Sequence, residues 1–133
     1  MAICELHFPE LPNSLNVLGW RDLCRELKGS GWDTPQSPFG YCEPPKIPAV
    51  YMFIMLDKNF FEKCVVGYVG MSRQIGNRFN NHPKFNEMKK LDYHIMRYFL
   101  PVPDCELRDR ERGLIQRFDP PWNIQGRSVG LPQ

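Results

Sequence analysis

Three segments of the chain carry the apolar patterns that are typical of β-strands. Residues 49–56 and 64–69 form two apolar runs rich in Val, Ile, Tyr and Phe, the residues that strands favour. The polar segment between them, residues 57–63, is long enough for an antiparallel hairpin. Residues 91–100 alternate in part between apolar and polar positions and end at Pro101, which favours a third strand. The pattern therefore predicts a small three-stranded antiparallel sheet.

A helix followed by an irregular segment is expected before these strands. Residues 14–28 place apolar side chains at three- and four-residue spacing, with Ser14 as N-cap and Gly29 at the end. The apolar positions of this helix are Val17, Trp20, Leu23, Cys24 and Leu27. Residues 29–48 contain three glycines and five prolines, so regular structure is not expected there. A long Gly/Pro-rich segment of this kind is typical of an arm, a functional loop or a linker, and Trp32 indicates that part of it packs.

Two further helices are expected on either side of the third strand. Ser72 can cap a short helix in which Ile75 and Phe79 face inward. Asp104 can cap a longer helix over residues 105–118. The order strand, strand, helix, strand, helix predicts an α+β fold in which helices flank the antiparallel sheet.

The composition is that of an ordinary globular chain, with 42% hydrophobic and 24% charged residues. At 133 residues the chain is long enough for one domain with a buried core. The longest apolar stretch has eight residues, well short of the roughly 20 that span a bilayer. The first residues lack the basic flank and apolar run of a signal peptide. Five cysteines without a CxxC or CxxH pair favour reduced thiols, so we expect a cytoplasmic protein with no membrane segment.

Charge is unevenly distributed, although the net charge is only +2. Residues 1–45 hold six acidic and three basic side chains, a balance of −3, whereas residues 71–100 hold six basic and two acidic ones, a balance of +4. A local basic surplus favours an anionic partner, but a solvated helix face produces similar counts. The charge distribution alone leaves both interpretations open.

Glu111 stands in the apolar stripe of the expected last helix, four residues after Leu107 and three before Leu114. A carboxylate at such a position must be paired, neutralised or bound to a cation, because an unpaired buried charge is very costly. A salt bridge to an arginine is one explanation. A divalent cation such as Mg²⁺, held by one carboxylate together with water and substrate phosphate, is the other.

Five other polar residues could take part in chemistry. Arg78 and His82 are four residues apart, which would place them on one helix face, either as a surface pair or as a phosphate clamp beside a proton-transfer group. Tyr51 and Tyr68 lie in two expected strands, where aromatic residues usually pack in the core but a phenol can also act as a general base. Asn123 follows Pro-Pro-Trp, a position typical of turn or cap residues.

Together these residues resemble the motifs of the GIY-YIG nuclease family in order and spacing. Residues 49–51, Ala-Val-Tyr, stand where the first motif has Gly-Ile-Tyr, and residues 68–70, Tyr-Val-Gly, stand for Tyr-Ile-Gly. Arg78 lies eight residues after the motif glycine, as the catalytic arginine of the family does, and His82 stands where many members have histidine. Glu111 opens a segment similar to the family's metal-binding Glu, with the terminal Asn twelve residues further on. The alanine in the first motif departs from the family pattern without changing a reactive group.

The resemblance implies a divalent-metal-dependent endonuclease that hydrolyses phosphodiester bonds in DNA. The implied catalytic residues are Tyr51, Tyr68, Arg78, His82, Glu111 and Asn123. Glu111 would bind one Mg²⁺ or Mn²⁺, which acts as a Lewis acid on the leaving oxygen.

The other implied residues would supply the proton chemistry and the phosphate clamp. Tyr51 would act as general base toward the attacking water, or position it, and Arg78 would neutralise charge on the phosphate oxygens. Tyr68 and His82 would assist proton movement or hold the phosphate. Asn123 would hold the geometry of the site by hydrogen bonds.

The resemblance also implies a domain organisation. A GIY-YIG-like core would span residues 49–124, after an N-terminal helix and irregular arm at residues 1–48 and before a C-terminal tail at residues 125–133. A chain of this size, without appended domains, resembles the small restriction-like or phage-type members of the family.

Double-stranded DNA is the implied partner. The basic residues expected to contact its phosphates are Arg73, Lys84, Lys89 and Lys90. One site cuts one strand, so cutting both strands would call for a homodimer or higher homo-oligomer, with Trp20 and Leu27 at an interface. The alternative, from another class, is a non-catalytic nucleic-acid-binding module that keeps the nuclease fold.

Overall fold

A computed structural model describes residues 16–37, 40–56, 62–80, 82–91 and 93–123. Its elements in chain order are β1 (Leu18–Gly19), α1 (Trp20–Gly29), β2 (Gln36–Ser37), β3 (Gly40–Tyr41), β4 (Ala49–Leu56), β5 (Lys63–Ser72), α2 (Ile75–Asn80), α3 (Pro83–Lys89), β6 (His94–Pro101), the 3₁₀ turn η1 (Asp104–Glu106) and α4 (Leu107–Phe118). No helix in this described part of the chain combines the length and apolar character needed to cross a membrane.

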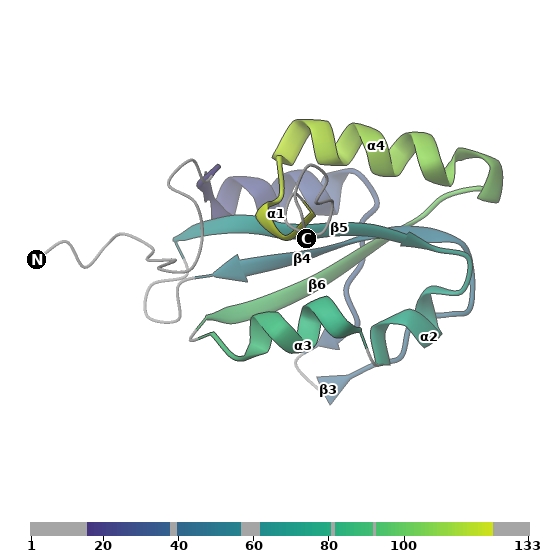
Figure 1. Ribbon diagram of the computed structural model, residues 1–133, viewed down its shortest axis with the longest axis horizontal. Coiled ribbons are helices and arrows are strands. Elements are labelled where there is room, and N and C mark those ends of the chain that lie inside the picture. The colour runs from purple at the N-terminus through teal and green to yellow at the C-terminus, as the bar shows by residue number, and fades with distance from the viewer. Residues whose placement is uncertain (1–15, 38–39, 57–61, 81, 92, 124–133) are drawn as a thin grey trace, which may run out of the picture.

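The main sheet is antiparallel and has the strand order β1-β5-β4-β6 (Figure 1). The predicted α+β class is confirmed, and the three predicted strands are present as β4, β5 and β6. The strand count is wrong, because the two-residue strand β1 pairs with the start of β5 and adds a fourth strand at that edge. β4 lies in the middle of the sheet and all eight of its residues are buried, as its continuous apolar run requires.

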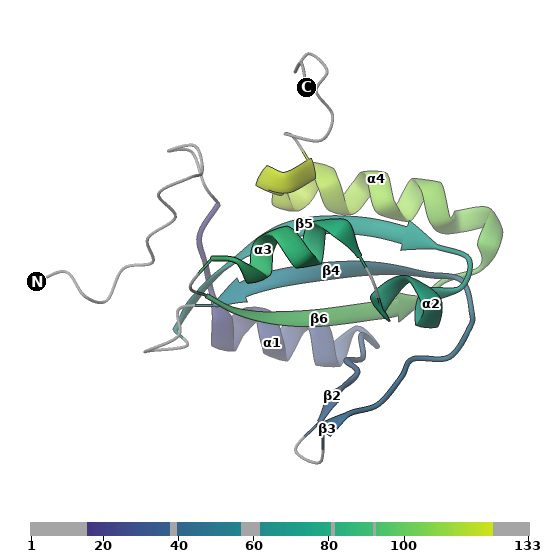
Figure 2. The same cartoon turned by 60° about the horizontal axis from the view of Figure 1, so that its bottom comes forward.

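Helices cover both faces of the sheet (Figures 1 and 2). On one face, α2 and α3 bury Ile75, Phe79 and Met88 against the odd-numbered side chains of β4. On the other face, α1 and α4 pack against the even-numbered side chains of the same strand. Fully burying a leucine or phenylalanine contributes about 1.5–3 kcal/mol, so the two cores hold the sheet from both sides. The inward orientation predicted for Ile75 and Phe79 is confirmed.

The N-terminal helix is shorter than predicted. It begins at Trp20 with Gly19 as N-cap, because residues 18–19 pair with β5 instead of continuing a helix. Ser14, the predicted N-cap, lies outside the described residues, and Val17 precedes the helix and is 45% exposed. The predicted end at Gly29 is confirmed.

α1 is a structural part of the domain. Leu27 is only 2% exposed and packs against the sheet in the core shared with α4, so it is not available for the predicted subunit interface. Trp20 is half-buried, with its ring edge-on to Tyr98 at 6.1 Å between centroids.

The segment 29–48 is more ordered than its glycines and prolines indicate. β2 and β3 form a short two-stranded ladder, and Asp33 bridges to Phe99 of β6 through two backbone hydrogen bonds of 2.9 and 2.8 Å. The prediction of irregular structure was therefore wrong at these positions. The prediction that Trp32 packs is confirmed, since it is half-buried against the core.

Arg78 and His82 do not share a helix as predicted. α2 ends at Asn80, and His82 is the N-cap of the separate helix α3, with extended backbone angles of φ −101° and ψ 124°. Pro83 explains the break, because proline disfavours a helical conformation in the preceding residue yet suits the first position of a new helix. The sequence pattern did not predict α3.

The start of α2 is anchored to the preceding loop. The backbone N–H groups of Ile75 and Gly76 donate to the carbonyls of Ile47 and Pro45, at 3.1 and 3.2 Å. A Cβ atom at Gly76 would lie 2.4 Å from the carbonyl oxygen of Pro44, so only glycine fits without a backbone shift.

This close approach leads to a test of stability. Gly76→Ala should lower the free energy of unfolding by about 1–3 kcal/mol, the usual cost of overpacking a buried site. Gly113→Ala is the matched control, because a Cβ there meets nothing within 4 Å, and alanine should raise helix stability by up to about 1 kcal/mol. Urea unfolding measures both. Equal stability of Gly76→Ala and the wild-type chain would show that the loop is not fixed against α2.

Candidate active site

Tyr51, Tyr68 and His82 form one compact cluster on the α2–α3 face of the sheet. In the β4–β5 register Tyr51 lies opposite Gly70 and Phe53 opposite Tyr68, which places both tyrosines on the same face. The ring centroids of Tyr51 and Tyr68 are 6.2 Å apart, and the His82 ring lies 5.5 Å from Tyr51 and 5.2 Å from Tyr68. Three residues separated along the sequence are thus brought within contact distance.

A hydrogen bond of 2.7 Å joins Tyr51 Oη to His82 Nε2. His82 Nδ1 accepts the backbone N–H of Lys84 at 3.0 Å as the cap of α3. Because Nδ1 is an acceptor, the neutral imidazole carries its proton on Nε2, and Nε2–H donates to Tyr51 Oη. His82 therefore orients the Tyr51 hydroxyl.

Aromatic side chains enclose this hydrogen bond. Phe53 lies 4.9 Å from the His82 ring and stacks on Tyr68 at 5.7 Å, and Phe79 lies edge-on to Tyr51 at 5.5 Å. Tyr51 and His82 are each 1% exposed, whereas Tyr68 is half-buried and is the most accessible of the three. A low-dielectric surrounding strengthens the buried hydrogen bond, and tight packing fixes the ring orientations.

Gly70 allows the Tyr51 hydroxyl to lie directly against β5. A Cβ at this position would be 2.5 Å from Tyr51 Oη, too close for any side chain. Gly70, the glycine of the second motif, is required here because the Tyr51 phenol fills the space that a side chain would need.

Asn123 lies beside the same part of β5. Its amide oxygen accepts the backbone N–H of Val69 at 2.7 Å, and its amide nitrogen donates to the Val69 carbonyl at 2.8 Å. The side chain thus pairs with the strand edge as another strand would, next to Tyr68 and Gly70 along the chain. The preceding Trp122 is buried in the core that contains Tyr51. Asn123 therefore joins the segment after α4 to the strand that carries the second tyrosine.

Arg78 lies on α2, one residue before Phe79, whose ring contacts Tyr51. The side chain of Arg78 is outside the described part of the structure. α2 thus places Arg78 beside the cluster.

Glu111 lies on α4 and is half-buried, as its place in the apolar stripe predicts. Burial raises the pKa of the Glu111 carboxyl above its ordinary value, and the nearby charge of Arg108 partly opposes that shift. Among the described residues no hydrogen bond or ion pair reaches this carboxylate, so the salt bridge that was one explanation for it is not found there. α4 packs on the face of the sheet opposite the tyrosine–histidine cluster, and no described contact links Glu111 to that cluster.

A half-buried carboxylate of this kind suits a divalent cation that keeps most of its ligands as water and phosphate. Within the described ranges there is no group of three or more His, Cys, Asp or Glu side chains that could hold a metal ion. A cation at Glu111 would therefore take most of its ligands from water and substrate phosphate.

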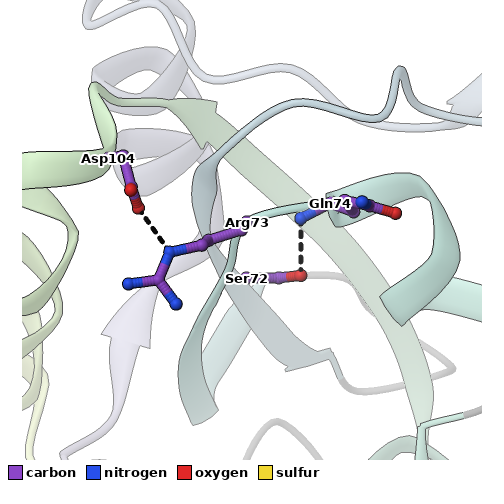
Figure 3. A network of polar contacts seen from close by, with 4 residues as sticks. All are labelled: Ser72, Arg73, Gln74 and Asp104. Carbon is purple, nitrogen blue, oxygen red and sulfur yellow. Dashed lines mark hydrogen bonds and ion pairs between the residues drawn. The ribbon is translucent and has the colours of Figure 1, made fainter.

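The predicted DNA-contacting residues occupy different surroundings. Arg73 is exposed and its Nε donates to Asp104 Oδ1 at 2.7 Å (Figure 3). Lys89 is exposed, with its ammonium 5.6 Å from the Phe85 ring centre, and Lys90 is exposed at the end of α3. Lys84 is half-buried next to His82. Three of the four thus lie on or beside α3.

Arg97 is a residue that the sequence reasoning missed. It lies on β6 opposite Phe53, with its guanidinium 4.5 Å from the Phe85 ring centre and 5.8 Å from that of Phe79. Its Nη1 donates to the Phe79 carbonyl at 3.5 Å, at the end of α2. Arg97 therefore holds the end of α2 against the sheet. The signal was available, because a charge between Ile95 and Phe99 interrupts the apolar alternation of its strand.

Comparisons with protein-family models, with curated proteins and with solved structures found no match to this chain.

The raised pKa of Glu111 leads to a test by pH. The unfolded chain loses this proton at a lower pH than the folded chain, so ionisation of Glu111 destabilises the fold as pH rises above the ordinary value of 4.5. Glu111→Gln should match the wild-type chain below pH 4.5 and become progressively more stable than it toward neutral pH. Urea unfolding in EDTA at several pH values measures this difference.

Glu106→Gln is the control for this test, because it removes one exposed carboxylate from the neighbouring turn. A loss of stability in Glu111→Gln at neutral pH would show that the carboxylate has a cationic partner in the folded chain.

Proposed function

We propose that this chain is a metal-dependent DNA endonuclease of the GIY-YIG type. The observation that carries the proposal is the hydrogen-bonded pair of Tyr51 and His82, packed against Tyr68 and the motif glycine Gly70. The motif spacing predicts that these four positions belong to one site, and their proximity on one face of the sheet supports a shared chemical role. Asn123 supports the proposal from the adjacent strand edge.

In this proposal Tyr51 is the general base or the group that positions the attacking water. An unperturbed phenol is a poor base near pH 7. The hydrogen bond with His82 Nε2 fixes the position of the Tyr51 hydroxyl, from which it would orient the attacking water. Tyr68, the more accessible ring, contacts the phosphate or the water. His82 acts through Tyr51 as an orienting group.

Glu111 holds the divalent cation, and Arg78 clamps the phosphate. Mg²⁺ or Mn²⁺, when bound, supplies Lewis-acid stabilisation of the leaving oxygen. Arg78 neutralises charge that develops on the non-bridging oxygens, as a bidentate guanidinium is suited to do. Because α4 packs on the face of the sheet opposite the cluster, the proposal requires Glu111 to reach the same phosphate past the edge of β5.

Double-stranded DNA is the proposed substrate, and α3 provides a basic surface beside the site. Lys84, Lys89 and Lys90 contact phosphates and position the duplex without reading its sequence. One such site cuts one strand, so cleavage of both strands requires two copies of the chain.

A non-catalytic nucleic-acid-binding module is the second candidate. Two observations favour it: the Tyr51 side chain is almost fully buried, and no described contact links Glu111 to the cluster. In that case the basic surface binds nucleic acid while the cluster only stabilises the fold.

Cleavage of DNA separates the two functions. The wild-type chain with Mg²⁺ or Mn²⁺ should nick or linearise supercoiled plasmid, and EDTA should stop the reaction. Glu111→Gln removes the charge that holds the metal, and Tyr51→Phe removes the phenol oxygen, so each should lower kcat by about 10²–10⁴-fold. Gel analysis of single-turnover time courses measures these rates.

A melting curve tests the metal site without turnover. Mg²⁺ should raise the melting temperature of the wild-type chain but not that of Glu111→Gln, because only the native carboxylate binds the cation.

Binding of several DNA substrates without cleavage, in either metal, would support the non-catalytic module. Wild-type turnover by Glu111→Gln would refute the metal assignment alone.

The basic surface of α3 has its own test. Lys89→Ala and Lys90→Ala should each weaken binding to all sequences alike and reduce the slope of log K against log salt by about 0.9. Lys46→Ala, an exposed lysine outside α3, is the charge-matched control. An unchanged slope in the α3 variants would show that these lysines belong to a solvated face.

A further inference from the structure

We propose that a cleft between the end of β5 and the start of α4 binds a backbone phosphate that flanks the scissile one. The cleft has a volume of about 420 Å³ and is lined by Met71, Ser72, Arg73, Asp104, Leu107 and Arg108, among others. None of these lining residues belongs to the tyrosine–histidine cluster. The inference rests on the proposed function, because it assumes that the anion is a phosphate of DNA.

Two guanidinium groups line this cleft. Arg73 is held by its Nε atom, which donates to Asp104, and Figure 3 shows its two terminal nitrogens pointing away from that carboxylate. Arg108 makes no hydrogen bond or ion pair with any described residue. An arginine fixed by one edge can offer its remaining N–H groups to a phosphate in the bidentate geometry that guanidinium favours.

Two carboxylates also line the cleft, and each has a cationic partner. Asp104 pairs with Arg73 itself, and Asp109 pairs with Arg112 at 3.7 Å. Both pairs are largely exposed, so each contributes little to stability and can rearrange in favour of an incoming phosphate. The lining holds two arginines and two aspartates, and Arg112 brings the local sum to one positive charge. Arg108 therefore attracts the anion, and the terminal N–H groups of Arg73 can donate to it as well.

The position of the cleft fits a flanking phosphate. Arg73 follows Gly70 by three residues, so its Cα lies at most about 10 Å along the chain from the point where β5 meets the Tyr51 hydroxyl. Arg108 precedes Glu111 by three residues on α4, which places the two on neighbouring positions of one helix surface. Phosphates of one strand recur about every 3.4 Å of helix axis. A strand whose scissile phosphate meets the proposed site would thus pass this cleft within about three nucleotides.

Salt-dependent binding tests the cleft without cleavage. The probe is a fluorescently labelled duplex in Ca²⁺, titrated with the full chain between 50 and 300 mM salt. Arg73→Ala and Arg108→Ala should each reduce the slope of log K against log salt by about 0.9, as expected for the loss of one phosphate contact. Arg110→Ala is the matched control, because Arg110 is an exposed α4 arginine that is not among the cleft residues. It should leave the slope nearly unchanged.

Two further variants make the result specific. Asp104→Asn removes a negative charge but keeps both arginines, so binding should be retained or become tighter. Arg73→Gln replaces Arg73→Ala if the alanine variant does not melt cooperatively. Slopes equal to that of Arg110→Ala in both cleft variants would overturn the proposal.

The outcome for the cleft is distinguishable from that for catalysis. Duplex binding with the expected slopes but no cleavage in Mg²⁺ would support the cleft while refuting the nuclease. Cleavage with unchanged slopes would refute the cleft alone. Failure of the wild-type chain to bind duplex DNA would overturn both.

Discussion

The hydrogen bond between His82 Nε2 and Tyr51 Oη is the interaction on which the candidate site depends. It connects the central strand of the sheet to the junction between α2 and α3, two parts of the chain that are 31 residues apart. The donor in this hydrogen bond is determined by the other ring nitrogen. Nδ1 accepts the backbone N–H of Lys84, so the imidazole proton is on Nε2. The N-cap interaction of α3 thereby determines that His82 is the donor to Tyr51 in the core.

Close packing around this bond explains residues that carry no reactive group. Gly70 leaves room for the phenol, and Phe53 and Phe79 hold the rings in place. Asn123 extends the same constraint to the segment after α4 by pairing with both backbone groups of Val69. Buried polar groups need such complete pairing, because an unsatisfied donor or acceptor costs about 1–3 kcal/mol. The hydrogen bonds of Tyr51, His82 and Asn123 therefore also hold separate elements of the fold together.

The two charged residues that interrupt apolar patterns, Arg97 and Glu111, differ in whether the fold provides a partner for the charge. Arg97 interrupts an apolar strand face, and its guanidinium lies on two phenylalanine rings and donates to a helix carbonyl. Glu111 interrupts an apolar helix stripe and has no such partner among the described residues. The first charge is stabilised by the fold through cation–π contact and hydrogen bonding. The second is left half-buried with a raised pKa, and the proposed function would pair it with a bound cation.

Sequence pattern alone determined the three long strands, the α+β class, the burial of Ile75 and Phe79, and the half-buried position of Glu111. These features follow from local periodicity, which depends only on neighbouring residues. Tertiary structure decided the rest. Residues 18–19 form a strand because they pair with the edge of β5. His82 is not in the same helix as Arg78, because Pro83 begins a new helix. The hydrogen bond from His82 to Tyr51 depends on packing between distant elements, and periodicity contains no information about such contacts.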